Sequence, residues 1–145
     1  MNRNLTGVRS RFSRTLRVLL FPLVVAGCSN TGEGLGAVEG VIQLDGKPLS
    51  GASVIFEPLN GSPSIGYADE DGQYELRFSR HAMGATVGDH KVRVSTAEDQ
   101  EGRRSKERVP ARYNVKTELT ASVKSGHNSI DFDLNSGGPV VQPRN

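Results

Sequence analysis

Apolar and polar residues alternate, position by position, in short runs along most of the chain. The clearest stretch is Gly40–Pro58, GVIQLDGKPLSGASVIFEP, in which two alternating runs flank a centre rich in turn residues. One face of these two runs is wholly apolar and consists of Ile42, Leu44, Ala52, Val54 and Phe56. A period of two residues that is bounded by Gly and Pro predicts β-strands joined by turns.

Five further runs continue this pattern, and no window of the chain has a convincing helical period. The seven predicted strands are Val38–Leu44, Ala52–Glu57, Ser64–Ala68, Gln73–Phe78, Asp89–Thr96, Glu118–Lys124 and Ser129–Leu134. They are short, half polar and spaced by roughly ten residues, which favours a β-sandwich over a buried parallel sheet. Because one apolar face alone cannot exclude water, two sheets are expected to pack face to face.

The segments between the strands differ in length and character. Leu44 to Ala52 is long for a tight hairpin, and Pro48 removes one donor from a strand ladder, so the first two strands are expected in different sheets. The segment LDGKPLSGA would then be the corner between the sheets. A crossing loop is expected at Ser79–Val87, and the last turn is expected at Ser125–Asn128.

The longest connection begins with a run of mixed charge, Ala97–Arg108, AEDQEGRRSKER. Such a run predicts a solvated, mobile loop. A binding or cleavage site at Arg103-Arg104 is the alternative interpretation. Tyr113, which follows the apolar residues of this connection, is expected to pack on the edge of the sandwich.

The net charge is distributed unevenly along the chain. The 145 residues carry a formal charge of +2, but five arginines and no acidic residue precede Cys28. Subtracting these five from the 18 basic residues leaves 13 against 16 acidic residues, a charge of about −3. The basic excess therefore belongs to the leader, and nucleic-acid binding is not expected of the mature chain.

The leader has the organisation of an export signal. Met1–Arg17 is polar and positive, and Val18–Gly27, VLLFPLVVAG, is apolar. This run is shorter than the roughly 20 apolar residues that a bilayer-spanning helix needs. A positive segment, a short apolar run and small residues at its end predict a signal peptide that is removed. Cys28, the only cysteine of the chain, follows directly.

Val25-Ala26-Gly27-Cys28 resembles the bacterial lipobox. The resemblance implies cleavage before Cys28, acylation of Cys28 as the lipid-attachment residue, and membrane association through the acyl chains. A plain secretory signal or a buried structural cysteine are the alternatives, but Cys28 has no partner for a disulfide. Two or more acyl chains anchor a protein stably without a transmembrane helix. Ser29, which is not Asp, favours the outer membrane in the Gram-negative sorting pattern.

These features divide the chain into four parts. Residues 1–27 are the predicted lipoprotein signal peptide, and residues 28–36 are the lipidated cysteine and a flexible, Gly-rich tether. Residues 37–134 are the predicted β-sandwich domain, which is large enough for a modest single core without disulfides. Residues 135–145, NSGGPVVQPRN, are expected to be a disordered tail.

The acidic turn Asp69-Glu70-Asp71-Gly72 admits two interpretations. Clustered carboxylates suit Ca²⁺, but the ligands that complete an EF-hand loop are missing after Gly72. The favoured interpretation is a hairpin turn in which Asp side chains cap backbone N–H groups and Gly72 has a positive φ.

No constellation of residues predicts catalysis. His81, His90 and His127 are isolated on separate elements, and the sole cysteine lies in the lipobox, so no Cys–His pair is available. The chain has neither a Gly-x-Ser-x-Gly elbow nor a His-Glu-x-x-His motif. We therefore predict no enzyme activity, no catalytic residue, no cofactor and no metal ligand.

Five segments in order, GVIQLDGKPLSGASVIFEP, ADEDGQYEL, GATVGDHKVRV, VPARYNVKTELTASV and GHNSIDFDL, resemble small bacterial lipoproteins with a carboxypeptidase regulatory-like, transthyretin-like domain. The resemblance covers Glu39–Leu134 and implies a seven-stranded Greek-key β-sandwich of the prealbumin type with no established reaction. Ala68 departs from a frequent Thr before the acidic turn, and His90 departs from a usual aromatic residue. Transthyretin-like hydrolases use paired His with Arg and a C-terminal Tyr-Arg-Gly-Ser motif, which this chain lacks.

We therefore expect an exported, lipid-anchored, non-catalytic β-sandwich that acts as a structural or interaction module at the bacterial cell envelope. The partner would be an envelope protein or a glycan, and no oligomeric state is predicted. The alternative is a surface module that binds a glycan or peptide through the loops Leu59–Ile65, Arg80–Gly88 and Ala97–Arg108. Hydrolysis is the third and least favoured function.

Overall fold

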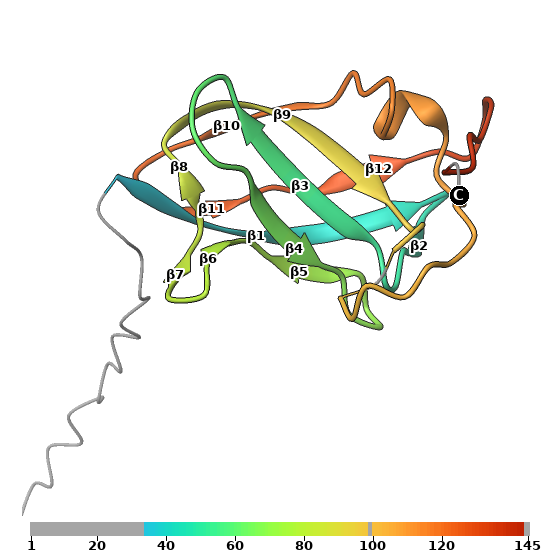
Figure 1. Cartoon of the computed structure of the whole chain (residues 1–145), viewed down its shortest axis with the longest axis horizontal. Coiled ribbons are helices and arrows are strands. Elements are labelled where there is room, and N and C mark those ends of the chain that lie inside the picture. Colours follow the sequence, from blue (N-terminus) through green and yellow to red (C-terminus); the bar gives the residue numbers. More distant parts are fainter. Residues whose placement is uncertain (1–33, 99, 144–145) are drawn as a thin grey trace, which may run out of the picture.

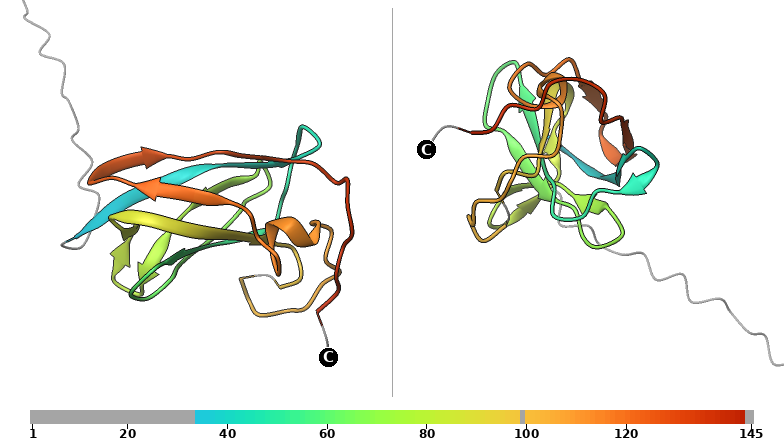
Figure 2. Two further views of the ribbon diagram at one scale, coloured as in Figure 1. Left: turned by 90° about the horizontal axis from the view of Figure 1, so that it is seen from above. Right: turned by 90° about the vertical axis from the view of Figure 1, so that its right-hand side faces the viewer.

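The computed structural model describes residues 34–98 and 100–143, so the leader and the predicted lipid-attachment residue Cys28 lie outside the described residues. The described part consists of short strands in two facing sheets and one 3₁₀ turn, η1 (Ala111–Tyr113). Figure 1 shows the strands crossing the molecule, and Figure 2 shows the two layers from above. The predicted all-β, sandwich-like architecture is confirmed.

The first sheet is built around one long strand, β1 (Leu35–Leu44). Along one edge, β1 pairs in parallel with β11 (Gly126–Ser129) and then with β12 (Phe132–Leu134). Along its other edge, β1 pairs antiparallel with three short strands, which are β8 (Ala85–Thr86), β5 (Gln73–Glu75) and β2 (Lys47–Pro48). A single strand therefore contacts every other member of its sheet.

The second sheet is antiparallel throughout. Its order is β10 (Thr120–Val123), β9 (Gly88–Ser95), β3 (Ser53–Pro58), β4 (Ser64–Tyr67), β6 (Arg77–Ser79) and β7 (Ala82–Met83). The longest pairing joins β3 to β9, from Ser53 opposite Ser95 to Pro58 opposite His90. All seven predicted strands thus overlap an observed strand.

The core lies between the two sheets. Its largest fully buried side chains include Ile42 from the first sheet and Phe56 from the second. The rings of Phe56 and Phe132 meet edge to face with centroids 6.1 Å apart, and Tyr74 stacks on Phe132 at 6.3 Å. Such aromatic pairs stabilise a core by about 0.5–1.5 kcal/mol beyond their buried area. The inward faces predicted from the alternation are confirmed in β3, β9 and β12.

The corner between the first two strands is confirmed, because β1 and β3 belong to different sheets. The corner also contains a hairpin that was not expected. Asp45 and Gly46, with φ of 53° and 73°, join β1 directly to β2, where Leu44 faces Lys47. Two positive φ values are the signature of a two-residue type I′ turn, so Asp-Gly makes the hairpin and the following residues make the crossing.

The predicted strand Gln73–Phe78 is divided between the two sheets at Leu76. Its first half, β5, pairs with β1, whereas its second half, β6, pairs with β4 and β7. Leu76 is fully buried, donates its N–H to the Val38 carbonyl at 2.9 Å, and accepts the Gly84 N–H at 2.7 Å. The alternation continues unbroken through the crossing, so periodicity alone cannot locate the change of sheet.

Two predicted connections contain strands. The crossing loop Ser79–Val87 includes β7 and β8, which lie in different sheets. The expected last turn at Ser125–Asn128 is wrong in extent, because Gly126 already begins β11. The Asn128 amide donates to the carbonyls of Lys124 and Ala37 and thereby joins the chain reversal to β1. No helix among the described residues is long and apolar enough to cross a bilayer.

Two segments that were expected to be loose lie against the domain. The charged loop returns to the second sheet at Glu107, whose side chain is buried against Ser95 and Thr96. Residues 135–143 follow a defined path at the end of the molecule opposite the start of β1 (Figure 1), and Ala111 donates its N–H to the Pro139 carbonyl at 2.8 Å. We call residues 135–143 the strap. Hydrogen bonds to side chains hold both segments, which a composition argument cannot foresee.

Candidate functional site

His90 belongs to the core. It begins the inward face of β9 with 3% of its surface exposed, and its ring lies 5.7 Å from that of Phe56. Its Nδ1 is 3.0 Å from the Gly88 carbonyl oxygen, and its Nε2 is 3.2 Å from the Thr86 hydroxyl. Both ring nitrogens therefore contact groups of the local fold.

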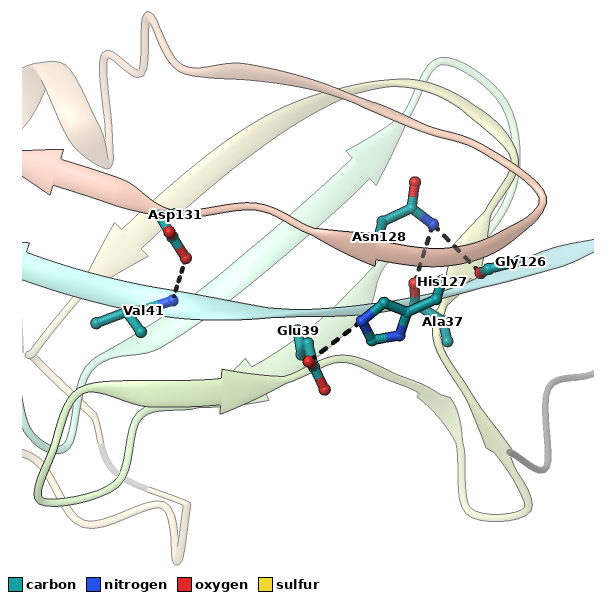
Figure 3. Close-up of polar contacts among 7 residues, drawn as sticks. All are labelled: Ala37, Glu39, Val41, Gly126, His127, Asn128 and Asp131. Atoms are coloured by element: carbon teal, nitrogen blue, oxygen red, sulfur yellow. Dashed lines mark hydrogen bonds and ion pairs between the residues drawn. The ribbon is translucent and has the colours of Figure 1, made fainter. Parts of the chain in front are cut away.

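His127 lies on the outer surface of the first sheet. Its Nε2 is 3.2 Å from a carboxylate oxygen of Glu39 on β1, and both side chains are more than half exposed. Figure 3 shows this pair beside Asn128 on the parallel β1–β11 ladder. His81 lies in the turn between β6 and β7, in the second sheet. The three histidines thus lie on separate parts of the fold, as the sequence predicted.

Beyond the last residue pair of the β1–β11 ladder, a side-chain carboxylate takes the place of a main-chain carbonyl as hydrogen-bond acceptor for β1. Asp131, between β11 and β12, accepts the Val41 N–H at 2.8 Å, as Figure 3 shows. Ile130 donates its N–H to the Glu39 carbonyl, and its own carbonyl accepts the Tyr74 hydroxyl at 2.6 Å. Burial, together with the nearby charge of Asp131, raises the pKa of Tyr74 above its ordinary value. This polar cluster organises the break between two parallel ladders, and its Glu39, Tyr74 and Asp131 also line an open surface pocket of about 440 Å³.

The acidic turn caps backbone N–H groups, as the favoured interpretation predicted, but it joins β4 to β5 in the other sheet and is therefore not a hairpin. One carboxylate oxygen of Asp69 accepts the N–H groups of Asp71 and Gln73, each at 2.9 Å. Gly72 has a φ of 77°, and a Cβ there would lie 2.5 Å from the Ile42 carbonyl oxygen. Within residues 34–98 and 100–143, no three His, Cys, Asp or Glu side chains are grouped to hold a metal ion.

A groove runs along the outer face of β4 and β6. Its volume is about 480 Å³, within the range of small-ligand sites. Pro63 and Met83 line it from two of the loops expected to bind a ligand, and Gln100 lines it from the third. The loops at Leu59–Ile65 and Arg80–Gly88 nevertheless lie at one end of β9 and the charged loop follows the other, roughly 23 Å away. The first loop therefore reaches the groove through Pro63 and Ile65, and the other two reach it through Met83 and Gln100.

The groove contains the one tyrosine that is not in the core. Tyr74 and Tyr113 are 3% and 9% exposed and belong to the core cluster, whereas Tyr67 is half-buried in the groove wall. Ile65, 37% exposed, lies two positions before it on the outward side of β4. Arg77 stands opposite Ile65 on β6. An aromatic ring, an apolar side chain and a guanidinium thus share one surface.

Sequence reasoning missed the carboxylate of Glu107. Its Oε1 accepts the N–H groups of Thr96 and Val109 at 3.0 and 2.9 Å, and its Oε2 accepts the Ser95 hydroxyl at 2.5 Å. In the sequence it is one acidic residue in a run of mixed charge. The available signal was its position just before the buried Val109-Pro110 pair, where a charged side chain must find partners.

Searches of family models, curated proteins and solved structures find no match to this chain.

Proposed function

We propose that this protein is an exported, lipid-anchored and non-catalytic interaction module of the bacterial cell envelope. The observation that carries the proposal is Cys28 at the end of the apolar leader run, in the setting of a lipobox. The all-β domain begins within a few residues of this position, since β1 starts at Leu35. A compact sandwich on a short stalk suits contact with envelope components.

The short stalk constrains how the domain would sit on a membrane. Six residue steps separate Cys28 from Gly34, and an extended chain of that length spans at most roughly 20 Å. The end of the sandwich at which β1 starts would therefore face the lipid surface. The strap, at the opposite end in Figure 1, would face away from it.

The non-catalytic part of the proposal is supported by what the titratable side chains do. The His90 ring packs in the core, Asp69 caps a turn, and the Glu107 carboxylate fixes a loop to β9. Each is engaged in folding contacts rather than aimed at a shared cavity. This supports an interaction role over hydrolysis.

The finer fold assignment is also part of the proposal. We assign the domain to the carboxypeptidase regulatory-like, transthyretin-like group with a Greek-key sandwich. The support is the order of the five sequence segments and the passage of consecutive strands between two sheets.

Replacement of Cys28 by Ser tests the anchor. Wild-type protein is expected to incorporate labelled palmitate and to sediment with membranes, and Cys28→Ser is expected to lose both. Ser29→Ala, which keeps the cysteine, is the matched control. Membrane sedimentation of Cys28→Ser, with no palmitate incorporated by either form, contradicts the anchor. In-cell crosslinking followed by pull-down tests the interaction role, and recovery of no envelope partner argues for a passive surface component.

A second candidate function, glycan binding, is favoured by the groove beside Tyr67. Aromatic rings stack on apolar sugar faces, while Arg77, Glu75 and Gln100 offer hydrogen bonds to hydroxyl groups. Binding to an array of envelope glycans is expected for the wild type and is expected to fall at least tenfold for Tyr67→Ala. Val140→Ala, an exposed change outside the groove and outside the three loops, is the control. Absence of any glycan signal for the wild type excludes this candidate.

A further inference from the structure

The strap is held to the domain by a small set of directional contacts. At its start, Arg112 donates to the Asn135 carbonyl at 2.9 Å and also to the Gly137 carbonyl. In its middle, the Pro139 carbonyl accepts the Ala111 N–H. None of these bonds belongs to a regular strand ladder. The strap thus lies on the surface as an extended peptide does, and Figure 2 shows it passing across the end of both layers.

The most specific contact is made by Gln142. Its Oε1 accepts the Glu107 N–H, and its Nε2 donates to the Glu107 carbonyl, both at 3.0 Å. One side-chain amide therefore satisfies both main-chain groups of a single residue, which gives geometric selectivity for Gln at this position.

A small apolar cavity lies beside this contact. It encloses about 140 Å³ between the outer face of the second sheet and the strap. Ile55 of β3 and Val115, which follows η1, line it on the domain side, and Val141 lines it on the strap side. Val115 is 66% exposed and Val141 is 46% exposed, so this apolar contact is incompletely closed. We call Glu107, Ile55 and Val115 the strap seat.

The strap seat is held in place by contacts that do not involve the strap. The Glu107 carboxylate accepts the N–H groups of Thr96 and Val109, which fixes the main chain that Gln142 recognises. Ile55 is held by the β3–β9 ladder, and the Asn114 amide donates to the Val109 carbonyl just before Val115. A preformed surface of this kind binds with little ordering of its own.

From this geometry we infer that the strap seat is a docking site for an extended peptide with a β-branched residue followed by Gln, and that the strap occupies this site in cis. The inference deepens the proposed interaction role and rests on it. The chain's own Val141-Gln142 shows which chemistry the seat accepts. The strap then acts as an intramolecular competitor, and a partner segment with the same pattern must displace it.

Competition by a labelled peptide tests this inference on the full chain. The probe is a synthetic peptide with the sequence of residues 135–145, NSGGPVVQPRN. Fluorescence anisotropy is expected to show at least tenfold tighter binding to the Val141→Asp/Gln142→Ala double variant than to the wild type, because the variant strap leaves the seat. A probe with Ala in place of its Gln is expected to lose this binding.

Two controls separate the possible failures. Val115→Asp added to the double variant is expected to abolish probe binding, whereas Val87→Asp, at an exposed valine remote from the seat, is expected to leave it unchanged. A double variant with wild-type unfolding behaviour that does not bind the probe overturns the inference, as does equal binding to wild type and variant. If the double variant fails to fold, Gln142→Ala alone replaces it under the same criteria. Probe binding requires neither Cys28 nor an envelope partner. The anisotropy result can therefore be interpreted even if the proposed function is wrong.

Discussion

Gly40 is the residue at which the two parallel ladders of β1 meet. Its neighbours along the chain, Glu39 and Val41, bond to Ile130 and Asp131 on either side of the gap between β11 and β12. An added Cβ at Gly40 would lie 1.9 Å from the Ile130 carbonyl oxygen, which also accepts the Tyr74 hydroxyl. The glycine is therefore required by close backbone approach, a property that no periodicity argument reveals.

Gly40→Ala is expected to lower the free energy of unfolding by about 2–3 kcal/mol, because the extra methyl group must push a hydrogen-bonded carbonyl aside. Urea denaturation measures the change. Gly137→Ala is the matched control, since its Cβ would meet Asn135 Oδ1 at an ordinary 3.5 Å, and a change within about 0.5 kcal/mol is expected there. Equal midpoints for both variants would contradict the role of Gly40.

Tyr74 links stability to alkaline pH. Its raised pKa means that the folded state keeps the phenolic proton when the unfolded chain releases it near the ordinary value of about 10. Above that pH the unfolded state binds fewer protons, so stability is expected to fall as pH rises. Urea unfolding between pH 8 and 11 is expected to show this decline in the wild type and a shallower one in Tyr74→Phe. If stability falls as steeply with pH in Tyr74→Phe as in the wild type, other groups cause the decline. Tyr67→Phe is the matched control.

At the scale of elements, the alternation of apolar and polar residues predicted which positions are strands and which face of each strand points into the core. The inward faces of β3, β9 and β12 are correct because alternation maps directly onto the two faces of a strand. The change of sheet at Leu76 and the docking of Glu107 depend on contacts between distant residues, which local periodicity does not encode. For the candidate site, the sequence indicated the three loops but neither Tyr67 nor the groove that relates them.

The acidic turn gives an element-scale prediction. Asp69→Ala removes the acceptor for two backbone N–H groups and is expected to destabilise the domain by about 1 kcal/mol, with or without Ca²⁺. Asp71→Ala, which keeps the capping carboxylate, is expected to change stability by less than about 0.5 kcal/mol. Thermal unfolding in Ca²⁺ and in chelator measures both effects. Micromolar Ca²⁺ binding by calorimetry, lost in Asp71→Ala, would instead establish a calcium site.

At the scale of the whole molecule, the start of β1 and the strap lie at opposite ends. Val87 donates its N–H to the Gly34 carbonyl at 3.1 Å and so marks the end where β1 starts. Glu70 lies in the turn whose Gly72 carbonyl accepts the N–H of Ile42, toward the far end of β1. The proposed function would place the end with Val87 at the lipid surface and the opposite end toward a partner.

Fluorophores on introduced cysteines test this orientation in vesicles. A label at Val87→Cys is expected to be quenched by headgroup quenchers more strongly than a label at Glu70→Cys, because the stalk holds the first end near the lipid. The same labels on protein in detergent-free solution provide the reference. Equal quenching at both positions would show that the domain does not stand on its β1 end.

The parallel pairing of β1 with β12 has a mechanical consequence. A pull between the membrane and a partner held at the strap would act on the start of β1 and on the end of β12, in opposite directions along two parallel neighbours. Such a load shears the ladder, so its bonds must rupture together rather than one after another. β11, which lies along the same edge of β1, adds four further residue pairs to the resisting seam. If the proposed anchor holds, tension between the membrane and the strap would therefore load these parallel ladders in shear.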